Sequence, residues 1–247
     1  MANNPLVGAW ELVSDSRVGI RIYTGSHYAM LGAPKDRTRS AGNQATPDEA
    51  LEAFNSCFAL AGTYTLSGSR VTHTRLANTR PNLSGQAMVV DHAIHGDTMT
   101  ATAVSGSGSG TAGSSLTFRR VGSSGIGSPL VGTWEMVEDA RQGVLIYTGT
   151  HYALLWMLKE RKLPNGDQYT PEEALEALTT SGALAGTYTI AENTVTMERI
   201  ASSRPEGVGV AAVQEFTVEG DTLNLRGVSG IRPGDMNWRK VSKITGI

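Results

Sequence analysis

The sequence predicts an all-β protein built from two tandem antiparallel β-barrels, each with about eight strands and one short helix. The first observation behind this prediction is an internal repeat, because blocks of the 247-residue chain recur 124 positions later. The blocks 6–12, 23–29, 46–53, 61–65 and 96–98 recur as 130–136, 147–153, 170–177, 185–189 and 220–222. The second observation is the alternation of apolar and polar residues over short runs that end at glycine-containing turns, which is typical of half-buried strands.

The elements of the first copy are expected in a simple order. Strands are predicted over 7–13, 18–23 and 27–31, with a tight turn at Thr24-Gly25. A helix should begin at Thr46-Pro47-Asp48-Glu49 and run to about 58, because threonine caps, proline fits the first turn and acids favour the positive end of the helix dipole. Its counterpart should span about 170–180. Strands over 62–66, 70–77, 86–94, 98–104 and 115–121 complete the barrel.

The repeat also defines a domain organisation. We expect one barrel over residues 1–121, a glycine- and serine-rich linker over 122–129 and a second barrel over 130–247. The run 154–158 is apolar on both faces of its strand, so it should contact the other barrel as well as its own interior. We therefore predict a pseudo-twofold contact that relates His27 to His151. Residues 1–124 carry a net charge of +2 and the remainder −4, which favours contact between the halves.

Composition excludes several classes of protein. Hydrophobic residues make up 40% of the chain, which is enough to form a buried core. The net charge is −2, so binding to nucleic-acid phosphates is not expected. The single cysteine, Cys57, excludes an internal disulfide framework, and burial as a structural thiol is its simplest interpretation. No apolar run reaches the length of a membrane span, and residues 1–5 lack the basic and apolar segments of a secretory signal. We therefore expect a cytoplasmic protein.

Several of the repeated blocks resemble the bacterial lipocalin-like domains of the calycin group. The opening block 130–135 resembles their first strand, 147–152 their second hairpin and 185–189 the strand after the helix, and the turn at 220–223 also fits. The hairpin is shorter here, because the family has Tyr-Thr-x-Asp-Gly-His where this chain has Tyr-Thr-Gly-Ser/Thr-His. The resemblance implies a cup-shaped apolar cavity that accepts a small hydrophobic molecule. It also implies kinship with cofactor-free cyclases and hydratases.

The repeated hairpins supply the candidate catalytic residues His27, Tyr28, His151 and Tyr152. Histidine titrates near neutral pH, and a buried tyrosine hydroxyl is a fixed hydrogen-bond donor that can polarise a carbonyl or phenol. Successive residues of a strand face opposite sides, so each histidine should face away from its neighbouring tyrosine. The alternative is structural: each histidine follows a tight turn and bonds to the backbone. Both interpretations remain open at this stage.

The candidate ligand-binding residues share positions on strands expected to line a cavity. They are Tyr23, Met30, His73, Arg75, Tyr147, Leu154, Trp156, Met197 and Arg199. Arg75 and Arg199 would suit a carboxylate or enolate, because a guanidinium binds such groups in a bidentate manner. The alternative for these arginines is an ion pair that closes the barrel, with Asp15 or Glu11 as partner.

No metal or organic cofactor is expected. His92 and His95 are three positions apart on a strand, so their rings should face opposite sides, and no nearby carboxylate completes a zinc site. Haem held by one histidine stays open on the resemblance alone. We predict binding and transformation of a small hydrophobic molecule by acid–base chemistry of the isomerase, cyclase or lyase type. The alternative is a carrier without catalysis. The two copies should form an intramolecular pseudo-dimer, and a homo-oligomer stays open.

Overall fold

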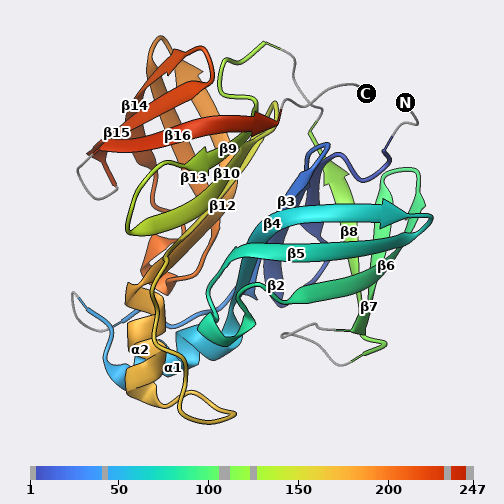
Figure 1. Ribbon diagram of the computed structural model, residues 1–247, viewed down its shortest axis with the longest axis vertical. Helices are drawn as coiled ribbons and strands as arrows, with labels where there is room; N and C mark the ends of the chain where they lie inside the picture. The colour runs from blue at the N-terminus through green and yellow to red at the C-terminus, as the bar shows by residue number, and fades with distance from the viewer. Residues whose placement is uncertain (1–3, 41–43, 106–111, 123–126, 231–234, 243–247) are drawn as a thin grey trace.

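The computed structural model describes residues 4–40, 44–105, 112–122, 127–230 and 235–242, and it consists of two closed antiparallel barrels of eight strands each (Figure 1). Residues 123–126 of the expected linker and most of the glycine–serine tract near 106–110 lie outside the described residues. Barrel 1 comprises β1 Gly8–Leu12, β2 Arg17–Tyr23, β3 His27–Pro34, β4 Phe58–Ser67, β5 Arg70–Asn78, β6 Ala87–His95, β7 Thr98–Ser105 and β8 Ser115–Val121. Barrel 2 comprises β9 Gly132–Met136, β10 Arg141–Tyr147, β11 His151–Leu158, β12 Ser181–Ala191, β13 Thr194–Ser202, β14 Ala212–Glu219, β15 Thr222–Ser229 and β16 Asp235–Ser242. The predicted fold class is confirmed.

Each strand pairs with its sequence neighbour, and the last strand closes on the first. Alternate side chains of a strand then face two different environments, the barrel interior and the other barrel. In β2, Ile20 and Ile22 face the other barrel, whereas Tyr23 belongs to the interior of barrel 1. Strand β4 is longer than predicted and starts at Phe58, because the chain enters the sheet directly after the helix.

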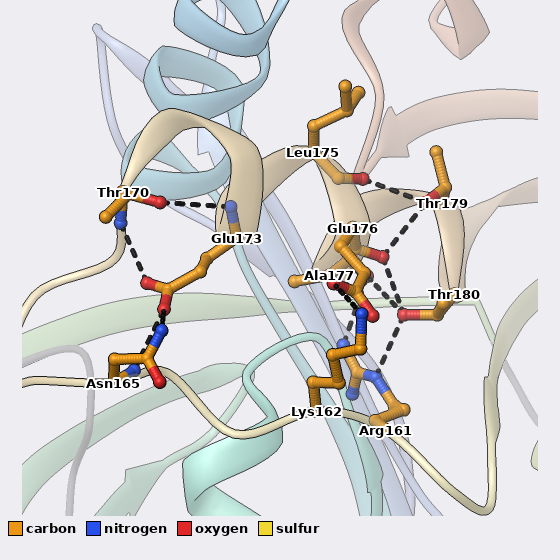
Figure 2. A network of polar contacts seen from close by, with 10 residues as sticks. All are labelled: Arg161, Lys162, Asn165, Thr170, Glu173, Leu175, Glu176, Ala177, Thr179 and Thr180. Atoms are coloured by element: carbon orange, nitrogen blue, oxygen red, sulfur yellow. Dashed lines mark hydrogen bonds and ion pairs between the residues drawn. The ribbon is translucent and has the colours of Figure 1, made fainter.

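Both helices begin with the predicted capping pattern. Helix α1 spans Pro47–Ser56 and α2 spans Pro171–Thr179, each with a threonine cap and a reciprocal glutamate bond to the cap backbone. In α2, Thr170 Oγ1 accepts from Glu173 N at 3.2 Å, and the Glu173 carboxylate accepts from Thr170 N at 3.0 Å (Figure 2). The same carboxylate accepts from Asn165, which ties the preceding loop to the helix.

The contact between the barrels is an apolar layer of small and branched side chains. It is formed by Ala9, Ile20, Ile22, Ala29, Leu31, Ala33, Cys57, Ala59, Ala61 and Ala77 from barrel 1, and by Val144, Ile146, Ala153, Leu155, Met157, Ala183, Ala185 and Ala201 from barrel 2. Ten of these side chains are alanines, which lets the two sheets approach closely. Helices α1 and α2 pack on each other and lie together at one end of the barrel pair (Figure 1).

Two arginines at matched positions hold the copies together. Arg37, from the loop after β3, donates to the carbonyl oxygens of Ser202 and Ser203 at 2.7 and 2.9 Å. Arg161 occupies the matched loop of the second copy and donates to Asn78 O and Thr79 O at 2.8 and 2.7 Å. Each arginine also donates to its own helix, at Ala53 O or Ala177 O. The contacts are reciprocal, as the predicted pseudo-twofold relation requires.

Candidate functional site

The structure places His27 and His151 in the contact between the barrels. The Nε2 atom of His27 lies 3.4 Å from Glu135 Oε1, and His151 Nε2 lies 3.6 Å from Glu11 Oε1. The two pairs are equivalent under the repeat, so they form a reciprocal interface contact. They are the ion pairs that cross between the copies among the described residues, so the difference in net charge between the halves acts through few direct contacts.

The other ring nitrogen of each histidine is also engaged. His27 Nδ1 lies 2.7 Å from Ser26 Oγ, and His151 Nδ1 lies 2.8 Å from Thr150 Oγ1. Burial lowers the pKa of His151, and the charge of Glu11 opposes that effect. These contacts describe a structural role for both histidines, and a catalytic role stays a prediction.

A second group of polar side chains lies inside barrel 1. The hydroxyl of Tyr23 is 2.8 Å from His73 Nε2 and 3.3 Å from His92 Nε2, and Arg21 Nη1 is 3.2 Å from the same His92 nitrogen. All four residues are buried, and the guanidinium of Arg21 stacks 4.4 Å from the ring of Phe118. We call Arg21, Tyr23, His73 and His92 the barrel 1 polar cluster.

Burial dominates the electrostatics of this cluster. It lowers the pKa of His92 to about 3 and that of His73 well below its ordinary value, with the charge of Arg21 acting in the same direction. Burial raises the pKa of Tyr23 above its ordinary value, partly opposed by Arg21. At neutral pH the cluster therefore holds two neutral imidazoles and a neutral phenol beside one fixed positive charge. Such a set can relay a proton and stabilise an oxyanion.

The matched positions in barrel 2 are apolar. Leu145, Met197 and Phe216 replace Arg21, His73 and His92 of the polar cluster, and the hydroxyl of Tyr147 points to Met197 Sδ at 3.6 Å. Of the predicted ligand-binding residues, Met30, His73 and Tyr23 thus lie in the interior of barrel 1, and Leu154, Met197 and Tyr147 in that of barrel 2.

The sequence prediction did not include two members of the cluster. Arg21 shares a strand face with Tyr23, and His92 aligns with Phe216, so strand alternation and the differences between the copies contained the signal. His95 is exposed whereas His92 is buried, as expected for two rings that face opposite sides of a strand.

A cavity of about 970 Å³ lies at the end of barrel 2 where β12 begins and β13 ends. Its walls come from β11, β12, β13, helix α2 and the first copy's segment around Ala45. Trp156 and Arg199 are the predicted ligand-binding residues that line it. The volume is within the range of ordinary small-molecule sites. The matching region of barrel 1 holds two smaller pockets, one of about 10 Å³ behind Phe58 and one of about 220 Å³ beside Tyr169.

The repeat explains why only one of these regions is open. Three bulky residues at the end of barrel 1, Phe58, Leu83 and Tyr169, correspond to Gly182, Gly207 and Ala45 around the cavity of barrel 2. Tyr169 covers barrel 1 from the second copy, where its ring lies 4.5 Å from that of Phe54 and its hydroxyl donates to Asn82 Oδ1. Ala45 occupies the equivalent position over barrel 2, and its small side chain leaves room for the cavity.

At one cross-strand pair, the glycine and the aromatic residue have swapped strands between the two copies. Gly32 faces Phe58 in barrel 1, whereas Trp156 faces Gly182 in barrel 2, so each pair holds one aromatic ring and one glycine. A Cβ atom on Gly32 would lie 2.5 Å from the Phe58 ring, and one on Gly182 would lie 2.6 Å from Trp156 Nε1. The two aromatic rings therefore start from opposite strands, and only the Trp156 ring lines the open cavity.

The predicted arginines bond to backbone carbonyls. Arg75 Nη1 donates to Gln86 O at 3.4 Å and Arg199 Nη2 donates to Gly230 O at 2.5 Å. Glu11, which was the alternative partner for a barrel-closing ion pair, instead lies near Arg119 and His151. Cys57 is buried, and burial raises the pKa of its thiol to about 11.

Neither a metal cluster nor a membrane helix is found in the described part of the chain. No three histidine, cysteine or carboxylate side chains there come together in a way that could hold a metal ion. None of the described helices has the length and apolar character needed to cross a bilayer.

Comparison with known proteins gives one informative match. Residues 13–121 match the family model of the lipocalin-like domain. No curated protein matches the chain significantly. Among solved structures, a DNA polymerase sliding clamp from Pseudomonas aeruginosa is 8% identical with a TM-score of 0.15, covering 100% of this chain and 79% of that one. The DNA polymerase III beta subunit from Thermotoga maritima is also 8% identical with a TM-score of 0.15, covering 98% and 78%.

At such TM-scores, these two likenesses carry no argument about fold or function. The family match and the repeat do, because the second copy reproduces the strand order and helix position of the matched first copy. A lipocalin-like barrel suggests binding of a small hydrophobic molecule. Residues 13–121 thus match a lipocalin-like domain, and the two eight-stranded barrels fit a tandem duplication of that domain.

Proposed function

We propose that the protein binds a small hydrophobic molecule in the cavity at the end of barrel 2. The observation that carries this proposal is the cavity itself, which measures about 970 Å³ in one copy where bulkier matched residues leave pockets of about 10 and 220 Å³ in the other. Its apolar wall includes Trp156, Leu175, Leu184 and Val210. Polar side chains such as Arg199 and Glu206 also line it, and small-molecule sites combine an apolar lining with placed polar groups that fix the orientation of the ligand.

A second candidate function, at a separate place in the molecule, is acid–base transformation by the barrel 1 polar cluster of a small molecule admitted to the interior of barrel 1, in the manner of an isomerase, cyclase or lyase. The specific observation that favours it is the 2.8 Å contact between the Tyr23 hydroxyl and His73 Nε2, with His92 and Arg21 beside it. Barrel 2 keeps the tyrosine and loses the other three groups, so the polar interior is not a requirement of the fold. In this role His73 would accept or donate the proton, and Arg21 would stabilise an oxyanion.

Binding can be tested with a neutral fluorescent probe, N-phenyl-1-naphthylamine, and by native mass spectrometry of what co-purifies with the chain. The variant Ala45→Tyr adds the side chain that the other copy carries at this place, so we expect probe affinity to fall about tenfold or more. Leu163→Tyr adds the same side chain at an exposed position and should bind the probe as the wild type does. Wild-type affinity in Ala45→Tyr would place binding outside this cavity.

Catalysis can be tested on the co-purified molecule with the triple variant Arg21→Leu, His73→Met and His92→Phe. Each substitution introduces the residue that barrel 2 carries at the same position, which limits damage to the fold. Loss of conversion with retained probe binding is the expected result. Unchanged conversion would remove the polar cluster from any mechanism.

A further inference from the structure

Arg199 forms part of the cavity wall although its side chain is only 9% exposed. Its Nη2 donates to Gly230 O, and its Nε has no hydrogen-bond partner among the described residues. No carboxylate of the described chain lies within ion-pair distance of this guanidinium. A buried positive charge without a carboxylate is costly unless an anion accompanies it.

Tyr152 adds a second unsatisfied donor beside Arg199. Tyr152 on β11 lies opposite Gly186 on β12, which in turn lies opposite Arg199 on β13, so the two side chains approach across a glycine. The Tyr152 side chain is fully buried, and its hydroxyl has no partner in the described structure. Burial raises the pKa of Tyr152 and the charge of Arg199 partly opposes this, so the hydroxyl stays protonated at neutral pH and can donate.

The carboxylates that line the same cavity do not form ion pairs with Arg199. Glu206 accepts from the backbone nitrogen of Ser40 at 2.9 Å, and Glu176 lies 3.4 Å from Lys162 Nζ. Glu172 is exposed on the first turn of α2. None of them pairs with Arg199, so its positive charge lies apart from the acids, which are on α2 and on the turn after β13.

We propose that Arg199 and Tyr152 bind the oxyanion, of the carboxylate class, of an otherwise apolar ligand. The apolar body of the ligand lies against Trp156 and Leu184, and the anionic end points to the guanidinium. The inference rests on the proposed binding function and specifies its ligand as an amphipathic monoanion. Arginine is suited to this role because its planar donors match a carboxylate, and hydrogen bonds to charged groups are the stronger ones.

Barrel 1 repeats the same arrangement without the space for a ligand. Tyr28 lies opposite Gly62, and Gly62 lies opposite Arg75, in the same register as the barrel 2 triplet. At the corresponding end of barrel 1, the pocket behind Phe58 measures only about 10 Å³. The triplet is thus a shared feature of the duplicated barrel, and in barrel 2 it adjoins a ligand-sized cavity.

Two fluorescent probes that share one skeleton test the inference: neutral N-phenyl-1-naphthylamine and anionic 1-anilinonaphthalene-8-sulfonate. In Arg199→Met, the anionic probe should bind about tenfold or more weakly, and the neutral probe should change less than about twofold. Arg199→Lys should retain most of the anionic binding, and Tyr152→Phe should weaken it by a smaller factor. Arg226→Met removes an exposed arginine of β15 and should leave both affinities unchanged.

The chemistry of the anionic group is then tested by competition. Decanoate should displace the anionic probe from the wild type at lower concentration than 1-decanol, and Arg199→Met should abolish that difference. Equal effects of Arg199→Met on both probes, or none on either, would overturn the inference while leaving hydrophobic binding in place. If neither probe binds the wild type, the proposed function fails and the inference fails with it.

Discussion

Acid sensitivity of the barrel 1 polar cluster provides a direct test of its electrostatics. His92 is held neutral by burial, with a pKa of about 3 against an ordinary value of 6.5. A histidine whose pKa is lowered in the folded state contributes no penalty above pH 6.5. As the pH falls below that value, His92 becomes protonated in the unfolded chain but stays neutral in the folded chain. The free energy of unfolding therefore declines until the pH reaches the pKa of the folded state.

The size of this loss follows from the linkage relation. Between pH 7.0 and 4.5, one histidine with these two pKa values should lower the free energy of unfolding by about 2.5 kcal/mol. The variant Arg21→Leu with His92→Phe removes that contribution and installs the residues of barrel 2. Arg21→Leu alone is the matched control, because burial, the largest cause of the shift, remains. Urea unfolding followed by circular dichroism at both pH values measures the difference.

The comparison uses the change between the two pH values within each variant, so a general destabilisation by either substitution cancels. The double variant should lose about 2.5 kcal/mol less on acidification than Arg21→Leu. Equal losses in the two variants, within about 0.5 kcal/mol, would mean that burial does not keep His92 neutral, and the electrostatic account of the cluster would be wrong.

Three further predictions concern the fold. Arg161→Met removes bonds to two backbone carbonyls of barrel 1 and should lower the free energy of unfolding by about 3 kcal/mol in urea; a loss under 1 kcal/mol would show that this contact between the copies is weak. Gly186→Ala places a Cβ atom 1.8 Å from a backbone carbonyl oxygen and should abolish soluble folded protein, whereas Gly25→Ala, with open space around it, should fold. Gly182→Phe alone clashes with Trp156, and adding Trp156→Gly should recover about 2 kcal/mol in a double-mutant cycle; additivity would contradict the exchanged pair.

The repeat made much of the architecture predictable. Strand order, the helix start at Thr46 and the twofold relation of His27 and His151 all follow from local patterns that occur twice. The run Leu154–Leu158 is apolar on both faces because Leu155 packs against the other barrel and Leu154 against its own interior. Such patterns are reliable because a strand with two apolar faces needs two apolar neighbours.

The candidate site was less predictable because it depends on differences between the copies. The polar cluster exists where Arg21 and His92 have apolar counterparts, so a search for shared motifs passes over it. The cavity depends on residues distant in sequence, since Ala45 of the first copy lies over the end of barrel 2. No local sequence pattern predicts which barrel such a loop covers, because that depends on how the two barrels pack together.

Each barrel end is covered by a loop of the other copy, so the size of each opening depends on residues of both copies. Tyr169 belongs to the second copy and packs on Phe54 at the end of barrel 1, while Ala45 belongs to the first copy and lines the cavity of barrel 2. The arginines that bridge the copies, Arg37 and Arg161, fix these loops to backbone carbonyls of the opposite barrel. A single copy would therefore lack one wall of the cavity.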